Sequence, residues 1–182
     1  AGLLALIGLG WWAWPAPERP LPTPVARSAA PVWKASILAP PRPPSGAPAR
    51  SRDGVWQVSD LCTWRLDRDD GARLLLAPAC RLREDGAALA LEKGYVQVTT
   101  GTALTIALGD GLACEVEGEA ALFHDASTTL VECRSGRAQL LGTQAQVLPV
   151  PGAWWREGGQ TRLLRPGDVI WDGRIGSVKG GS

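Results

Sequence analysis

Residues 88–111 read ALALEKGYVQVTTGTALTIALGDG, and this stretch decides the fold class. Apolar and polar side chains alternate with a period of two at 88–91, at 95–98 and at 104–108, which is the pattern of half-buried β-strands. Gly109-Asp110-Gly111 follows them and suits a tight reversal of the chain. The stretch therefore predicts three short strands and a turn.

The same pattern extends on both sides of this stretch. Further runs of strand character are found at 55–58, 63–66, 73–76, 120–123, 129–132, 137–140, 145–148 and 168–171. Turn-forming residues separate them at Asp69-Asp70-Gly71, Glu84-Asp85-Gly86, Ser135-Gly136 and Pro166-Gly167. Because no stretch keeps a helical period for ten residues, we expect residues 53–182 to form one all-β domain, an antiparallel sandwich or β-roll of short strands.

Four cysteines add a constraint on this domain. Cys62 and Cys80 lie at equal distances from the turn at 69–71, so a hairpin there places them on opposing strands. Cys114 and Cys133 are arranged in the same way about the next polar segment. Four cysteines allow three pairings, and this symmetry favours the disulfides Cys62–Cys80 and Cys114–Cys133. The alternative, a zinc site made by all four thiolates, lacks a Cys-x-x-Cys pair.

The N-terminal residues have a different character. Residues 1–10 are apolar and uncharged, three tryptophans follow within 11–14, and Pro15 ends the run. Indole rings favour the membrane–water boundary. Fourteen helical residues cover only about 21 Å, which is short of a bilayer span. We therefore interpret residues 1–14 as the outer end of a transmembrane anchor helix that begins upstream. The alternative is a secretory signal peptide, although bulky Trp and Pro replace the small residues that precede a cleavage site.

Residues 15–52 have the composition of a linker. The segment 15–50 holds 11 of the chain's 15 prolines, which favours an extended polyproline II backbone. The linker has six Lys or Arg residues and only one acid, Glu18, whereas the rest of the chain has 13 basic and 17 acidic residues. A basic arm of this kind either meets anionic lipid or an acidic partner, or is simply solvated. The only apolar cluster of the linker contains three candidate partner contacts, Trp33, Ile37 and Leu38.

The predicted domain carries no catalytic constellation. His124 is the only histidine, and a Ser/His/Asp triad that used it with Asp125 or Asp60 would lack a nucleophile elbow. The acid pair Asp69-Asp70 fits turn chemistry, and Glu117 and Glu119 share one face of a predicted strand. We therefore expect no catalytic residue, no metal site and no cofactor, and a protein that is not an enzyme.

Trp154 and Trp155 are two further candidate partner contacts. Neighbouring residues of a strand point to opposite faces, so both indoles cannot enter one core. We expect one of them to be exposed, either against a partner or over the end of the sandwich.

Residues 89–171 also contain a succession of related motifs. These are LEKGYVQV (91–98), GEAALF (118–123), VECRSGRAQL (131–140) and LRPGD (164–168). They resemble the x-x-G-x-V-x-V strands and the final x-x-G-D/E turn of the periplasmic domain of the FecR family. The resemblance implies a transmembrane regulator, in which a cytoplasmic N-terminal segment controls a sigma factor and an all-β periplasmic domain meets an outer-membrane transducer. The family's cytoplasmic segment has no counterpart in these 182 residues, and the Pro-rich linker departs from the family pattern. FecR-like domains also serve as general binding modules of envelope proteins.

These observations lead to one functional expectation and two alternatives. We expect a non-enzymatic scaffold or accessory subunit of a bacterial envelope complex, held in the inner membrane by one span, whose periplasmic C-terminal domain binds another protein. The alternatives are a FecR-like signalling regulator of the anti-sigma type and a peptidoglycan- or glycan-binding envelope domain. Nucleic acid is not expected as a partner, because the folded part is acidic and has no Lys/Arg run interleaved with aromatic residues.

Overall fold

The computed structural model describes residues 32–39, 50–85, 88–142, 145–165, 167–171 and 176–178. The predicted anchor at 1–14 and most of the predicted linker lie outside the described residues. Within them the chain forms strands only, which confirms the all-β prediction. The described part accordingly has no helix that is long and apolar enough to cross a bilayer.

The strands are β1 (Trp33–Ala39), β2 (Val55–Gln57), β3 (Thr63–Arg68), β4 (Arg73–Leu76), β5 (Arg81–Asp85), β6 (Ala88–Ala107), β7 (Ala113–His124), β8 (Thr128–Leu141), β9 (Gln146–Val147), β10 (Gly152–Glu157), β11 (Gln160–Leu164), β12 (Val169–Trp171) and β13 (Gly176–Val178).

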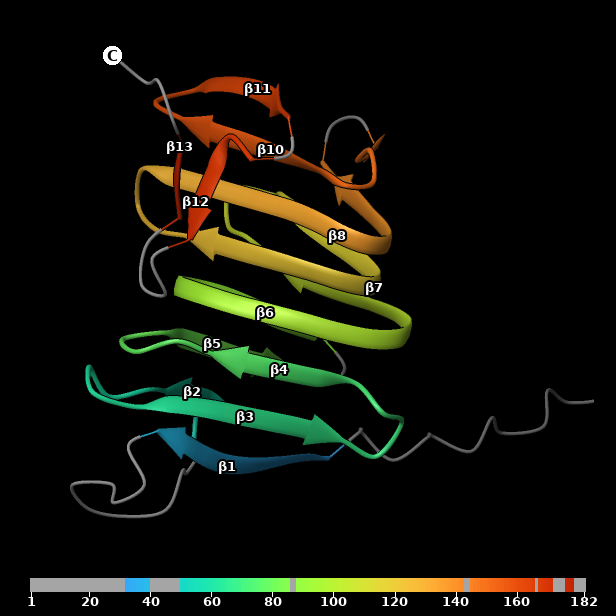
Figure 1. Cartoon of the computed structure of the whole chain (residues 1–182). Coiled ribbons are helices and arrows are strands. Elements are labelled where there is room, and N and C mark those ends of the chain that lie inside the picture. Colours follow the sequence, from blue (N-terminus) through green and yellow to red (C-terminus); the bar gives the residue numbers. More distant parts are fainter. Residues whose placement is uncertain are drawn as a thin grey trace, which may run out of the picture.

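Eleven of the described strands belong to one antiparallel sheet (Figure 1). Its main path runs β1-β3-β4-β6-β7-β8-β10-β11, while the pair β2-β5 joins through β6 and β9 joins through β8. Strands β12 and β13 form a separate hairpin. Figure 1 shows β2 and β5 behind β3 and β4, and it shows the long strands β6, β7 and β8 curving round into the rear layer. The architecture is therefore a β-roll of two layers made largely from one sheet.

The long strand β6 replaces three strands that the sequence predicted separately. Its first part pairs with β5, its middle part at 94–100 pairs with β4 and β7, and its last part at 104–107 pairs with β7 again. Between the pairs Thr100–Gly118 and Leu104–Val116, β6 has three residues, 101–103, where β7 has only Glu117, so β6 has two extra residues and forms a bulge. A bulge bends a strand and increases its twist. This bend carries β6 from the front layer to the rear layer.

Glycines make the matching bend in β7 and β8. Gly118 and Gly136 are register partners, and their φ angles are +119° and +77°. A Cβ added to either glycine would lie 2.8 Å from the Cα of the other. Side chains are therefore excluded where the two backbones cross. Ser135-Gly136, predicted as a turn, lies instead within β8 at this bend.

The main core fills the space between the layers. Its largest fully buried side chains include Leu66, Leu74, Leu76, Leu82, Leu91, Ile106 and Leu122, which come from both layers. Strand β5, which the sequence analysis missed, alternates exposed and buried side chains. Its acidic Glu84 is buried and pairs with Arg50 across 3.3 Å. Because the composition of β5 is polar, a hydrophobicity pattern does not reveal that alternate side chains of this strand point inward.

Strand β1 corrects the predicted boundary between linker and domain. The apolar cluster of the linker pairs antiparallel with β3 and forms one end of the sheet path. Trp33 is 7% exposed and belongs to the main core, with the Arg68 guanidinium 5.1 Å from its ring centroid. Lys34 forms an ion pair of 2.9 Å with Asp69. The folded domain therefore includes residues 33–39, well before the predicted start at residue 53.

Candidate interaction face

The outward side of the front layer carries a second, smaller hydrophobic cluster. It consists of buried Phe123, Leu130, Ala153 and Leu164 with partly buried Tyr95, Trp155 and Val169 packed against them. Strands β6, β7, β8, β10 and β11 supply most of this cluster, and β12 supplies Val169. The front layer is thus apolar on both sides along part of its length.

The register aligns four residues of this cluster and Arg162 into one row. The register partners along the row are Tyr95 with Phe123, Phe123 with Leu130, Leu130 with Trp155, and Trp155 with Arg162. The guanidinium of Arg162 lies 4.6 Å from the centroid of the Trp155 ring, which is the geometry of a cation–π contact. We refer to Tyr95, Phe123, Leu130, Trp155 and Arg162 as the outer row.

Charged groups flank the outer row on β8. The Arg134 Nε donates to the Glu132 carboxylate at 2.9 Å. Burial raises the pKa of Tyr95 above its ordinary value of 10, and the Arg134 guanidinium beside the phenol acts in the opposite direction. Tyr95 is therefore a neutral phenol at physiological pH, with an apolar ring and a polar tip. Such a side chain is favoured in protein interfaces.

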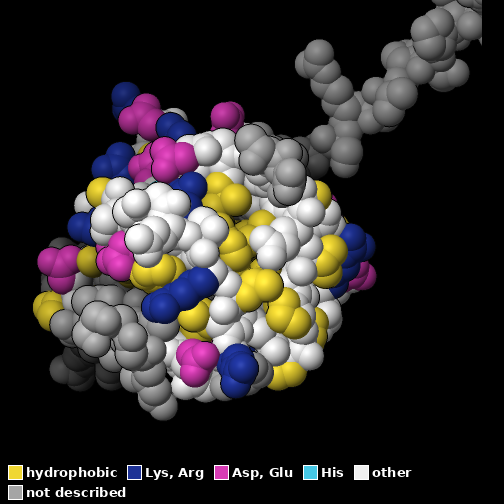
Figure 2. Space-filling view, turned by 90° about the horizontal axis from the view of Figure 1, so that it is seen from above, with side chains coloured by type: hydrophobic (Ala, Val, Ile, Leu, Met, Phe, Trp, Pro, Cys, Tyr) yellow, Lys and Arg dark blue, Asp and Glu magenta, His cyan; other side chains and the backbone are white. Residues whose placement is uncertain are grey.

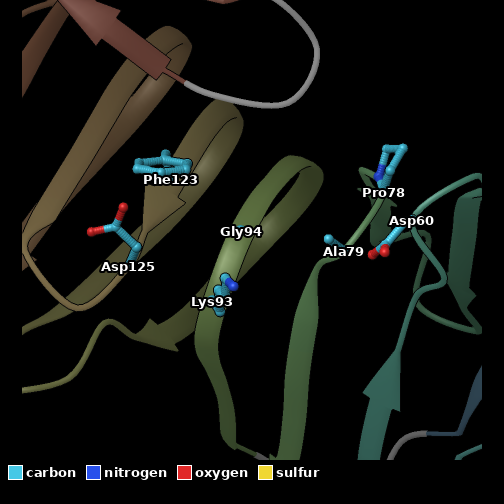
Figure 3. A pocket seen from close by; sticks show the side chains of 7 residues that line it. All are labelled: Asp60, Pro78, Ala79, Lys93, Gly94, Phe123 and Asp125. Carbon is cyan, nitrogen blue, oxygen red and sulfur yellow. The ribbon is translucent and has the colours of Figure 1, made fainter.

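A groove of about 440 Å³ begins at Phe123 (Figure 3). Phe123 and Asp125 stand on one side of it, at the end of β7, and Pro78 and Ala79 stand on the other side, between β4 and β5. Gly94 and Lys93 of β6 lie between the two sides, and Asp60 adds a carboxylate beside Ala79. The groove therefore combines an aromatic wall, an amine and two carboxylates, a set of groups that suits a peptide segment.

The C-terminal hairpin of β12 and β13 lies in front of this face. Figure 1 shows it running across β7, β8 and β10, and Val169 packs against the outward cluster. Viewed from the β11 end, Figure 2 shows hydrophobic side chains grouped near the centre of the surface, with charged side chains mainly around its edge. Leu163 of the terminal strand β11 is exposed at this end. Tyr95 and Trp155 of the outward cluster are only partly buried, so part of this cluster remains accessible.

The five predicted partner contacts differ in their exposure in the structure. Leu38 is 47% exposed and remains available, and Ile37 is partly buried against the main core. Trp33 and Trp154 are each 7% exposed and pack in that core, so neither is an exposed aromatic residue, and their contact with a partner stays a prediction. Trp155 points to the opposite face from Trp154, as expected, but it is partly buried rather than exposed, because it packs in the outward cluster.

The structure forms neither of the two predicted disulfides. All four cysteines are buried free thiols. The hairpin symmetry misplaces the register: Cys114 lies opposite Leu140, and Cys133 lies opposite Ala120. The β3–β4 ladder pairs Trp64 with Leu76, so Cys62 and Cys80 do not stand directly opposite each other. Burial raises the pKa of the Cys80 and Cys114 thiols to about 12, which makes them poor nucleophiles.

The residues considered for catalysis occupy structural positions. The His124 Nδ1 lies 3.0 Å from the hydroxyl of Thr129. The Asp125 carboxylate accepts hydrogen bonds from the backbone N–H groups of Ser127 and Thr128, which closes the β7–β8 turn. No group of three or more His, Cys, Asp or Glu side chains within the described ranges is placed to hold a metal ion.

The outer row and the groove do not follow from the sequence motifs, although the sequence contains one signal for the row. Residues 120–123 are four consecutive apolar residues, and all four are buried. A continuous apolar run indicates a strand that is covered on both faces. Ala153-Trp154-Trp155 repeats the signal on β10. The groove had no such signal, because its sides come from segments that are more than 40 residues apart.

Comparisons with known proteins support the fold. No protein-family model matches the sequence, and no curated protein matches it significantly. Two crystal structures of a "putative anti-sigma factor" from Parabacteroides distasonis, at 1.65 Å and 2.50 Å resolution, each superpose with a TM-score of 0.54 at 12% sequence identity. Each match covers 61% of this chain and 59% of that one, so the chain spans about three fifths of the length of these neighbours. At this identity the likeness establishes a shared β fold.

Proposed function

We propose that the chain is a non-enzymatic, membrane-anchored subunit of the bacterial envelope whose periplasmic β-domain binds another protein through the outer row and the adjoining groove. The observation that carries the proposal is the accessible part of the row: partly buried Tyr95 and Trp155 and exposed Arg162 flank the buried Phe123 and Leu130 on one face, beside a groove of about 440 Å³. Aromatic residues and Arg are enriched at the centres of protein interfaces, and Trp155 with Arg162 supplies such a pair.

The N-terminal composition supports the topology in this proposal. The apolar residues 1–14 suit the outer end of an inner-membrane span, and the Pro-rich segment after them suits an extended spacer. Of the basic residues in the predicted linker, Lys34 and Arg50 pair with acids of the domain itself. Fewer basic groups than the sequence suggested are therefore left for a lipid surface or a partner.

Site-directed photo-crosslinking in cells tests the proposal. A photoreactive phenylalanine analogue replaces Lys93 at the groove, and in a matched control it replaces Gln57, an exposed residue of β2 in the rear layer. We expect a discrete crosslinked protein from position 93 and none from position 57. Adding Trp155→Ala should lower the yield about tenfold, the effect of losing an interface aromatic residue. Equal crosslinking from both positions, or a yield that Trp155→Ala leaves unchanged, would contradict the proposal.

A second candidate function is that of a signalling regulator of the anti-sigma type. It is favoured by the fold likeness to the Parabacteroides distasonis protein and by the resemblance of residues 89–171 to FecR-family domains. In this case the protein that binds the outer row is a transducer, and binding alters transcription. Deleting the gene should then change transcription of a small set of operons, and the full chain, but not its Trp155→Ala variant, should restore it. An unchanged transcriptome would leave the accessory-subunit role as the better account.

A further inference from the structure

The strands that carry the outer row also carry a polar row on the opposite, inward side of the sheet. His124 of β7, Thr129 of β8, Arg156 of β10 and Thr161 of β11 are successive cross-strand neighbours. Two residues away along β7, β8 and β10, the side chains on the same face belong to the main core. This inner row is therefore the polar margin at which the core ends.

A turn from the rear layer closes over the inner row. The turn joins β6 to β7, and the N–H of Leu108 donates to the carbonyl of Leu112 at 2.8 Å. A Cβ on Gly109 would lie 3.0 Å from the Nε2 of His124, so the turn packs directly against the row. Asp110 of the turn meets the guanidinium of Arg156, with 3.2 Å between Oδ2 and Nη2.

Two pockets share this ion pair as a common wall. One pocket has a volume of about 460 Å³ and includes the apolar side chains Leu112, Leu140 and Trp154. The other has a volume of about 390 Å³ and includes the polar residues His124, Ser127 and Thr129. Because Asp110 and Arg156 line both pockets, a movement of Asp110 would leave the guanidinium facing both spaces.

Asp110 is a replaceable partner for Arg156. Its side chain is 82% exposed, whereas that of Arg156 is only 23% exposed. Ion pairs with an exposed carboxylate contribute little to stability, because water solvates that carboxylate almost as well. The guanidinium itself is held from behind by the buried Thr129, whose Oγ1 is 3.5 Å from Nη2. A carboxylate from solvent can therefore displace Asp110 and meet a positioned guanidinium.

We infer that these pockets bind a carboxylate that carries an apolar group, presented either by the C-terminus of a polypeptide or by a free small carboxylic acid. The carboxylate pairs with Arg156, and the apolar group lies against Leu112, Leu140 and Trp154. A monoanion suits the site better than a phosphate dianion, because Asp110 and Asp125 line the same polar pocket as the single guanidinium. This site is separate from the outer row and adds a second ligand to the proposed function.

The first experiment compares N-acetyl-leucine with its amide. The full chain, in a non-ionic detergent, is titrated with each compound and followed by ¹H–¹⁵N correlation spectra. We expect the backbone signals of Gly109–Leu112 and the Nε signal of Arg156 to shift with the acid. The amide should bind about tenfold more weakly, because it cannot form the charge-assisted hydrogen bonds. Equal affinity for acid and amide, or shifts confined to other regions, would overturn the inference.

The second arm of the titration distinguishes the two sources of the carboxylate. The peptide Ala-Gly-Ala-Leu with a free C-terminus is compared with N-acetyl-leucine. Tighter binding of the peptide supports a chain terminus as the ligand, and tighter binding of N-acetyl-leucine supports a small acid. If neither compound binds with millimolar affinity, the site does not exist.

Three variants test the role of the ion pair. Arg156→Gln should weaken binding of N-acetyl-leucine about tenfold, whereas Arg162→Gln, on the opposite face of the same hairpin, should leave it unchanged. Asp110→Asn should tighten binding, because it removes the competing carboxylate. Asn tolerates the positive φ of +49° at this position, so the Asp110 variant should fold even if the Arg156 variant does not. Weaker binding by Asp110→Asn, or unchanged binding by a folded Arg156→Gln variant, would refute the assignment.

Discussion

At the scale of single residues, the paired glycines at the bend of β7 and β8 are the least replaceable positions. We expect Gly136→Ala to lower the free energy of unfolding by about 3 to 5 kcal/mol, because it combines a strained positive φ with a clash against the β7 backbone. Gly71→Ala is the matched control: its φ is +91°, but no atom lies within 4 Å of the added Cβ. It should cost only the strain, about 1 to 2 kcal/mol. Urea unfolding of both variants measures the difference, and equal losses would refute the close-approach argument.

The protonation of His124, the only histidine, gives a second prediction at this scale. Burial and the neighbouring Arg156 hold the pKa of His124 below its ordinary value of 6.5, while Asp125 and Asp110 act in the opposite direction. The folded state therefore favours neutral His124. Its contribution to stability is complete above pH 6.5 and is lost as the pH falls through the lowered folded value. Urea unfolding from pH 7.5 down to pH 5 should show a decrease that His124→Gln largely lacks. The same decrease in that variant would show that other groups are responsible.

Residue roles were only partly predictable from sequence. Trp154 and Trp155 must point to opposite faces in any strand, and they do. Which face is covered depends on the register and on what packs there, so neither indole proved fully exposed. The cysteine pairs failed for a related reason. Symmetry about a turn fixes opposing positions only if the turn is centred where the sequence suggests, and the ladder of β7 and β8 is centred several residues later.

At the scale of elements, strand β1 is the main departure from the sequence analysis. The Pro-rich composition around residues 33–39 indicates a linker, whereas the segment itself has a strand's alternation, with Trp33 inward and Lys34 outward. Strand β6 was predicted wrongly in a different way, as three short strands instead of one long strand. Glu92-Lys93 and the stretch 99–103 interrupt its hydrophobic pattern, but bulges accommodate the residues that have no register partner there, and the pairing resumes beyond them. Local patterns thus located most strands but could not show where a strand bends and continues.

The role of β1 leads to a third prediction. Trp33→Ala should lower the free energy of unfolding by about 3 kcal/mol, because it removes a large buried side chain and its contact with Arg68. Leu38→Ala, at an exposed position of the same strand, should change it by less than about 1 kcal/mol. Chemical denaturation of the two variants gives the comparison. If Trp33→Ala proves as mild as Leu38→Ala, β1 contributes little to the stability of the folded domain.

At the scale of the whole molecule, one sheet supports two apolar surfaces and two candidate binding sites. The inner side of the front layer faces the main core and ends in the inner row, while its outer side carries the outward cluster. The sequence predicted the fold class because alternation is local. The candidate sites join residues from β6, β7, β8, β10 and β11, and only the register brings these residues together. The sites therefore could not be assembled from sequence alone.

The question of where the folded domain begins gives the last prediction. A fragment of residues 32–182 retains β1 and the ion pair of Arg50 with Glu84, whereas a fragment of residues 53–182 loses both and exposes the side of β3 that β1 covers. We expect the longer fragment to unfold in one cooperative transition. The shorter one should unfold at a lower urea concentration and with a smaller m-value, because it buries less surface. Size-exclusion chromatography should also show self-association of the shorter fragment alone, since an uncovered strand edge pairs with other chains. If both fragments share one midpoint, one slope and a monomeric state, β1 is an appendage, and the domain begins where the sequence analysis placed it.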